Sequence, residues 1–211
     1  MTVGTEPQGW VPVEHRLFGL DRRTFKPALI ALGVALVLIY GLQGLNAAIP
    51  WRNEIQAGQV LDLGGGATAV PPVGWQLENG TLTGGAGASA TSLQVLLVSG
   101  GARIELIGTT YDGSAAAFLQ QVRRSQGDSP QIPSGEGTLR TDSGLVGVVE
   151  TRTGPTGDGV DVAFKMAVGD SQAVSSAPAL LVRVRTAAGQ LEQYQHEVSA
   201  LLLSIKPGAA R

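Results

Sequence analysis

The sequence predicts an α+β protein with one N-terminal transmembrane helix, followed by an antiparallel sheet that packs with two helices. Three observations support this prediction. A run of 22 uncharged residues, 28–49, is long enough to cross a bilayer, because about 1.5 Å of rise per residue gives roughly 33 Å. Segments in which apolar and polar residues alternate then follow one another across short turns. Two further segments repeat apolar residues at helical spacing.

The apolar segment is expected to begin at Pro27 and to end at Pro50. Proline is tolerated in the first turn of a helix, and it disfavours helical geometry in the residue that precedes it. Four basic residues precede the segment and one follows closely: Arg16, Arg22, Arg23, Lys26 and then Arg52. The positive-inside rule therefore places the N-terminus in the cytoplasm and the rest of the chain outside it. A cleaved signal peptide is the alternative, but the apolar run exceeds the roughly 7–15 residues of its apolar region.

Small residues occur along one side of the predicted transmembrane helix, toward its outer half. They are Gly33, Gly41, Gly44 and Ala48. Small residues spaced by about three or four positions allow another helix to approach closely in lipid. We expect these four residues to pack against a partner helix. The alternative is that glycine and alanine are common in membrane spans and in this chain, which contains 30 glycines.

The chain is predicted to divide into five parts. They are a cytoplasmic segment (1–26), the transmembrane helix (27–50), a linker (51–66), an extracytoplasmic α+β domain (67–207) and a tail (208–211). The linker is expected because its segment has few bulky apolar residues and many glycines.

The strands of the domain are predicted from alternation and from turn residues between the alternating segments. Segments 93–97 and 103–106 form a hairpin around Ser99-Gly100-Gly101. Further strands are expected at 67–70, 145–152, 160–168 and 180–186. Because short turns connect the strands, an antiparallel sheet with helices packed on it is the simplest arrangement.

Two helices are predicted in the domain. The first follows Asp112 or Ser114, either of which is a suitable N-cap, and ends near Gln126. The second covers 190–205 and ends before Pro207. Its apolar residues recur every three or four positions and are expected to cover the sheet: Leu191, Tyr194, Val198, Leu201, Leu202 and Ile205.

The polar residues of the alternating strands fall on the face opposite the apolar ones. They include Arg103, Glu105, Asp161, Lys165, Arg183 and Arg185. A solvated sheet face is the simplest interpretation. The alternative is that this face docks to an acidic or mixed-charge partner surface, with Lys165, Arg183 and Arg185 as the basic element.

The motifs of several enzyme classes are missing from the sequence. The chain has no cysteine, so it forms no disulfide, thiolate zinc site or thiol nucleophile. His196-Glu197 begins like the H-E-x-x-H zinc motif, but Ala200 stands where the second histidine is needed. A net charge of -2 gives no attraction to nucleic acid. We therefore expect a protein that is not an enzyme, with no cofactor, no metal site and no nucleic-acid partner.

The order of features in the domain resembles the Mog1/PsbP-like domains. The features are Pro71-Pro72-Val73-Gly74-Trp75, the paired strands, Tyr111-Asp112-Gly113 before a helix with Phe118-Leu119-Gln120-Gln121-Val122, and the closing helix at 198–207. The resemblance covers 67–207 and implies a compact module that binds or scaffolds and lacks an active site. It also implies an exported domain of an actinobacterial membrane protein or lipoprotein, with the spanning helix in place of a lipidated cysteine. The chain has twelve arginines and three lysines, a ratio typical of a high-GC bacterium. Together with the predicted transmembrane helix, this predicts that the chain lies in a bacterial inner (cell) membrane.

The leading hypothesis is a non-enzymatic, single-pass inner-membrane protein whose exported domain is an accessory or assembly module of an envelope complex. Its partners would be the membrane and other membrane or envelope proteins. The alternative is a tethered module that binds a lipid or a small apolar ligand between the sheet and the helices. An apolar cavity beneath helix 190–205 would favour the ligand, and a close-packed core would favour the scaffold.

Overall fold

The protein is described by a computed structural model in which the chain forms two compact units, Met1–Trp51 and Arg52–Arg211. The residues that the structure describes are 16–17, 20–41, 53–85, 93–125 and 132–208.

The described residues of the first unit, 16–17 and 20–41, form mainly one helix. Strands β1 (Arg16–Leu17) and β2 (Leu20–Asp21) pair, and α1 (Arg22–Leu36) continues into a π-helical turn, η2 (Val37–Gly41). The large apolar side chains between Leu29 and Tyr40 are exposed. Among the described residues, none of the helices has both the length and the apolar character needed to cross a membrane.

Only two of the four small residues predicted to pack against a partner helix lie in the described part of this helix. Gly33 lies in α1, and a Cβ atom added there would meet no other atom within 4 Å. Gly41 is the last residue of η2. Gly44 and Ala48 lie outside the described residues, as does the part of the predicted transmembrane helix from residue 42 onward. Packing of these four residues against a partner helix stays a prediction.

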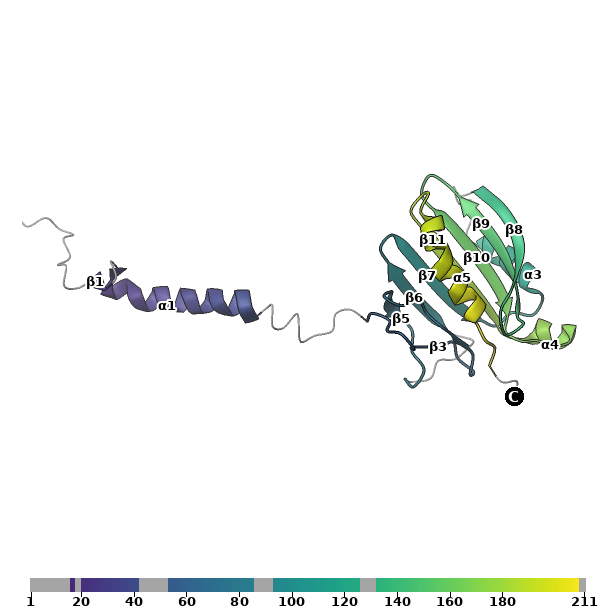
Figure 1. The fold of residues 1–211 in the computed structure, drawn as a ribbon, viewed down its shortest axis with the longest axis horizontal. Coiled ribbons are helices and arrows are strands. Elements are labelled where there is room, and N and C mark those ends of the chain that lie inside the picture. Colours follow the sequence, from purple (N-terminus) through teal and green to yellow (C-terminus); the bar gives the residue numbers. More distant parts are fainter. Residues whose placement is uncertain (1–15, 18–19, 42–52, 86–92, 126–131, 209–211) are drawn as a thin grey trace, which may run out of the picture. The chain divides into compact units, whose positions relative to one another are not determined.

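The second unit is α+β, as the sequence predicts, and is built on a seven-stranded antiparallel sheet (Figure 1). The strand order is β5-β6-β7-β11-β10-β9-β8, so two meanders meet where β7 pairs with β11. The strands are β5 (Gln76–Asn79), β6 (Gln94–Ser99), β7 (Ala102–Thr109), β8 (Ile132–Arg140), β9 (Val146–Thr153), β10 (Asp158–Lys165) and β11 (Ala179–Thr186). The predicted hairpin is the pair β6 and β7.

Helices cover both faces of this sheet. Helix α3 (Ala115–Ser125) connects β7 to β8 and packs on a cluster that contains Ala163. The 3-10 turn η3 (Leu191–Tyr194) and helix α5 (Gln195–Ser204) pack on a cluster that contains Val162. Neighbouring residues of a strand point to opposite faces, so α3 and α5 lie on opposite sides of the sheet (Figure 1). A short helix, α4 (Ser171–Ser176), joins β10 to β11.

Local contacts fix the start of α3. The hydroxyl oxygen of Ser114 accepts a hydrogen bond from the backbone N–H of Ala117 at 3.2 Å. Ser114 is therefore the capping residue, rather than Asp112. At the other end, Arg123 and Arg124 lie in the last turn, where their positive charges interact favourably with the negative end of the helix dipole.

The prediction of a linker at 51–66 is wrong, because most of this segment belongs to the folded unit. Ile55, Leu61 and Leu63 are buried in the core, and the N–H of Ile55 donates to the carbonyl oxygen of Trp75 at 2.8 Å. Strand β3 (Leu61–Asp62) pairs with β4 (Thr68–Ala69). The glycines between these strands, Gly64 to Gly66, adopt positive φ and make a tight turn.

Candidate functional site

The polar face that the sequence predicts is not solvated at its centre, and this expectation is wrong for two of its residues. Asp161 is 0% exposed and Lys165 is 2% exposed. Helix α3 packs on this face through Phe118 and Leu119, which contact the small and aliphatic residues between the charges. The strands do alternate as the sequence predicts, but helix α3 covers the polar side of the sheet at its centre.

Asp161 is the centre of a buried charge cluster. Both of its carboxylate oxygens contact Arg185, Oδ1 at 2.9 Å from Nη1 and Oδ2 at 3.0 Å from Nη2. Oδ1 also lies 3.6 Å from Nε of Arg183, and Oδ2 lies 3.6 Å from Nη2 of Arg152. Arg152 contacts Glu150 at 2.9 Å. Basic and acidic groups therefore compensate one another inside the molecule.

The three residues predicted to dock to a partner lie in different surroundings. The ammonium group of Lys165 donates to the carbonyl oxygen of Tyr111 and lies 5.7 Å from the centre of the Tyr111 ring. Burial lowers the pKa of Lys165, and the negative charge of Asp112 opposes that shift. Lys165 therefore ties the segment before α3 to β10 and is not on the surface. Arg183 and Arg185 have side chains that are 24% and 26% exposed, and docking through them stays a prediction.

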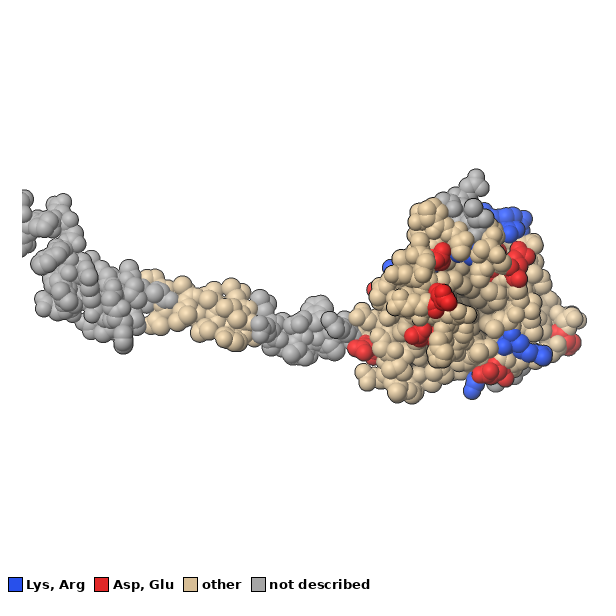
Figure 2. Space-filling model, turned by 45° about the horizontal axis from the view of Figure 1, so that its top comes forward, with Lys and Arg blue, Asp and Glu red and all other residues tan. Residues whose placement is uncertain are grey.

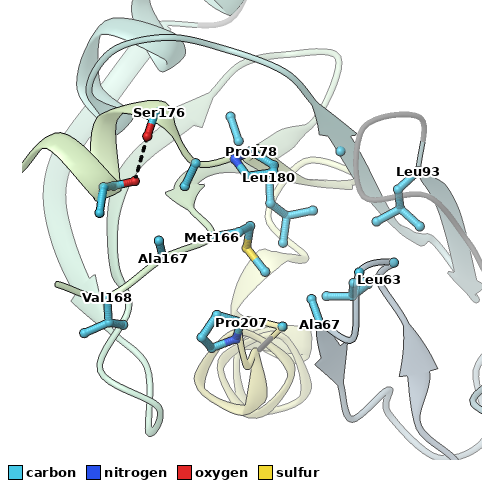
Figure 3. A pocket seen from close by; sticks show the side chains of 17 residues that line it. Leu63, Ala67, Leu93, Met166, Ala167, Val168, Ser176, Pro178, Leu180 and Pro207 are labelled. Atoms are coloured by element: carbon cyan, nitrogen blue, oxygen red, sulfur yellow. Dashed lines mark hydrogen bonds between the residues drawn. The ribbon is translucent and has the colours of Figure 1, made fainter. Parts of the chain in front are cut away.

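Two apolar hollows lie on the α5 side of the sheet. The first, here called the end cavity, has a volume of about 540 Å³ and lies beside α4, the turn between β3 and β4, and Pro207 (Figure 3). Ser176 supplies the one polar side chain among the described residues that line it. Its hydroxyl oxygen lies 3.0 Å from the carbonyl oxygen of Gln172 and 3.3 Å from that of Ala173, so its one proton already has an acceptor within the helix. The end cavity is therefore apolar, and the side chains described in its lining offer a ligand no free polar group.

The second hollow, here called the helix groove, lies between η3–α5 and strands β8, β9 and β10. Its volume is about 560 Å³. Six of the lining residues are apolar: Leu139, Val149, Val160, Leu191, Val198 and Leu202. The remaining lining residues are Thr151, Thr153, Asp158, Gly189, Glu192, Gln195 and Ser199.

Two glycines of β8 lie on the same face of the sheet as the groove. In the antiparallel register, Gly137 pairs with Val149 and Gly135 pairs with Thr151, so these positions share the groove face. A Cβ atom added at Gly137 would meet no other atom within 4 Å. At these two positions β8 supplies no side chain, whereas Leu139 of the same strand lines the groove.

The helix groove has a polar end and an apolar end. Thr153 and Asp158 flank the turn between β9 and β10. The N–H of Gly189 donates to Oδ2 of Asp158 at 2.6 Å, which brings η3 and Glu192 to the same end. Farther along, the lining consists of Leu139 and Val149 from the strands and of Val198 and Leu202 from α5. A ligand with a polar head and an apolar body matches this arrangement.

The helix groove is the stronger candidate for a binding site. Sites for small ligands usually have about 300–1,000 Å³, mostly apolar walls and a few polar groups that orient the ligand. Both hollows have a volume in this range. Several polar side chains gather at one end of the groove, whereas Ser176 is the polar side chain described in the end cavity. Sequence reasoning identified the apolar face of α5 but missed Asp158 and Glu192, because isolated acids form no motif.

Most of the surface of the second unit seen in Figure 2 is uncharged, with basic and acidic side chains scattered over it. This agrees with a charged-residue content of 15%.

Comparisons with models of known protein families and with curated proteins give no match for this chain. The resemblance to Mog1/PsbP-like domains therefore stays an expectation from the sequence.

Proposed function

We propose that the chain is a membrane-tethered, non-enzymatic module whose second unit binds a lipid or another small ligand with an apolar body. The observation that carries this proposal is the helix groove, because a close-packed interface beneath α5 would instead favour a scaffold. An accessory role in an envelope complex stays a prediction, and it loses Lys165 as a docking residue. The resemblance to Mog1/PsbP-like domains, which implies a module without an active site, agrees with the proposal.

The proposed tether is the segment 28–49, in a bacterial inner membrane with the N-terminus in the cytoplasm. This segment has no charged residue, and basic residues lie mainly before it. In the described part of the segment, side chains such as Ile30, Val37 and Tyr40 are more than half exposed. A continuous apolar surface of this kind is expected to be covered by lipid or by another protein.

The orientation of the tether can be tested with reporter fusions. A reporter that is active only outside the cytoplasm is expected to be active when it is fused after Arg211 and inactive when it is fused before Met1. The physical reason is that basic residues resist transfer across the membrane. The reverse pattern would contradict the orientation, and release of a soluble chain that begins near Ala47 would show a cleaved signal peptide.

Ligand binding can be tested on the unit 52–211 prepared without detergent. It is expected to bind a neutral solvatochromic dye such as Nile red, with increased fluorescence. Ser199→Leu places an apolar side chain in the helix groove, and leucine is well tolerated in helices. Losing the burial of one aliphatic group costs about 1.5–3 kcal/mol, which corresponds to an increase in Kd of about 10- to 100-fold. The measurement is a dye titration of both proteins.

The matched control is Ser176→Leu, which fills the end cavity with the same substitution. It is expected to leave the Kd unchanged. If Ser176→Leu abolishes binding and Ser199→Leu does not, the ligand occupies the end cavity and the groove assignment is wrong. If the unsubstituted unit melts cooperatively and binds no dye, binding of a neutral apolar ligand to this unit is rejected.

A further inference from the structure

The charges that line the helix groove are of one sign. Among its lining residues, the ionisable side chains are Asp158 and Glu192, and both are acids. The other polar groups at the lining are the hydroxyls of Thr151, Thr153 and Ser199 and the amide of Gln195, which carry no charge. Any ligand in the groove therefore meets negative charge at the polar end.

Asp158 is buried and forms no ion pair with the basic side chains that the structure describes. It is 9% exposed, and its Oδ2 atom accepts one hydrogen bond, from the N–H of Gly189. Among the described residues, no basic side chain forms an ion pair with Asp158 or with Glu192. This differs from Asp161 on the opposite face, which three arginines surround. A buried carboxylate is costly unless a positive group compensates its charge.

The two acids lie at one end of the groove, and the apolar lining extends away from them. They lie at the η3 end of the groove, next to Gly189, while Val198 and Leu202 continue the lining along α5. A ligand whose head is a cation and whose body is an aliphatic chain satisfies both parts at once. An anionic head would be repelled by both carboxylates, and a neutral head would leave Asp158 uncompensated.

On the basis of the proposed function, we infer that the helix groove selects amphiphiles with a positively charged head, such as a long-chain quaternary ammonium compound. The head lies between Asp158 and Glu192, and the chain follows the apolar floor formed by Val149, Val160 and Leu202. The groove volume of about 560 Å³ suits a single-chain ligand rather than a large assembly.

The test uses the full chain in nanodiscs of zwitterionic phospholipid. Three probes carry the same twelve-carbon chain with a photoreactive diazirine near its end, and their heads are trimethylammonium, hydroxyl or sulfonate. After irradiation, mass spectrometry quantifies the label on peptides that contain Leu139, Val149, Val198 or Leu202. The trimethylammonium probe is expected to label these peptides at least about tenfold more than the hydroxyl probe, since tenfold corresponds to one charge-assisted contact.

Variants identify the groups that provide the selectivity. Asp158→Asn keeps an oxygen that accepts from Gly189, and Glu192→Gln changes an exposed side chain, so both are compatible with folding. Each is expected to lower labelling by the trimethylammonium probe, and together they should reduce it to the level of the hydroxyl probe. Glu78→Gln is the matched control, because Glu78 is an exposed acid on β5 outside the groove lining.

The outcomes separate this inference from the proposed function. Equal labelling of the groove peptides by all three probes, or stronger labelling by the sulfonate probe, would overturn the charge selectivity and leave ligand binding intact. Unchanged labelling in the Asp158→Asn, Glu192→Gln double variant would also overturn it. If none of the probes labels the groove peptides, the proposed function fails together with the inference.

Discussion

Substitution of Asp161 by asparagine is expected to lower the free energy of unfolding of the second unit by about 3–5 kcal/mol. The side chain is 0% exposed and lies among Arg152, Arg183 and Arg185. Asparagine keeps the volume but removes the charge, so that guanidinium groups remain buried with insufficient compensation. Urea denaturation of the unit 52–211, followed by circular dichroism, measures the difference.

Glu105→Gln is the matched control for this prediction. Glu105 also faces an arginine, with Oε2 at 3.6 Å from Nη1 of Arg183, but its side chain is 24% exposed. Ion pairs that water can reach contribute about 0–1 kcal/mol, so this variant is expected to lose no more than that. Equal losses in the free energy of unfolding of the two variants would contradict the prediction that burial makes the Asp161 ion pairs more stabilising than the Glu105 pair.

The central strands were predictable because their environment leaves a regular pattern. In β7, buried and less buried residues alternate along all eight positions, and the hairpin turn between β6 and β7 is marked by glycines. Strand β8 left no such signal. It is an edge strand, and its residues from Pro133 to Thr138 are all exposed, so nothing selects apolar residues at every second position.

The covering of the polar face was not predictable from alternation alone. A charged residue in water and a charged residue in a buried ion pair look the same in a sequence. Asp161 and Arg185 therefore indicated a solvated face, although α3 encloses the residues around Asp161. The amphipathic helix itself was predicted, but not which face of the sheet it covers.

The groove could be predicted only in part. Leu191, Val198 and Leu202 were identified as the apolar side of the closing helix, and they do line the groove. Two glycines of β8, Gly135 and Gly137, face the same side of the sheet, and the sequence does not indicate this strand. The contact between Gly189 and Asp158 joins residues 31 positions apart, which no local pattern encodes.

Removal of the closing helix is expected to abolish cooperative folding of the second unit. A chain that ends at Gly189 lacks η3, α5 and Ile205, which follows α5. It therefore loses Val198, Leu201, Leu202 and Ile205, which are buried in the main core. Each buried aliphatic side chain contributes roughly 1.5–3 kcal/mol, and a domain of this kind usually has about 5–15 kcal/mol in total. The truncated chain 52–189 should therefore show no cooperative thermal transition, whereas the chain 52–211 should show one.

A single substitution tests the same packing without removing the helix. Leu201 is 1% exposed, and Leu201→Ala is expected to cost about 2–5 kcal/mol, because the cavity that remains adds to the lost burial. The neighbouring Leu203→Ala makes the same change at a half-buried position and should cost clearly less. Packing of α5 on the sheet explains this order, because the helix turns Leu201 toward the core and Leu203 away from its centre. A chain 52–189 that melts as cooperatively as 52–211, or equal losses in the two leucine variants, would contradict the assignment of α5 as the cover of the sheet.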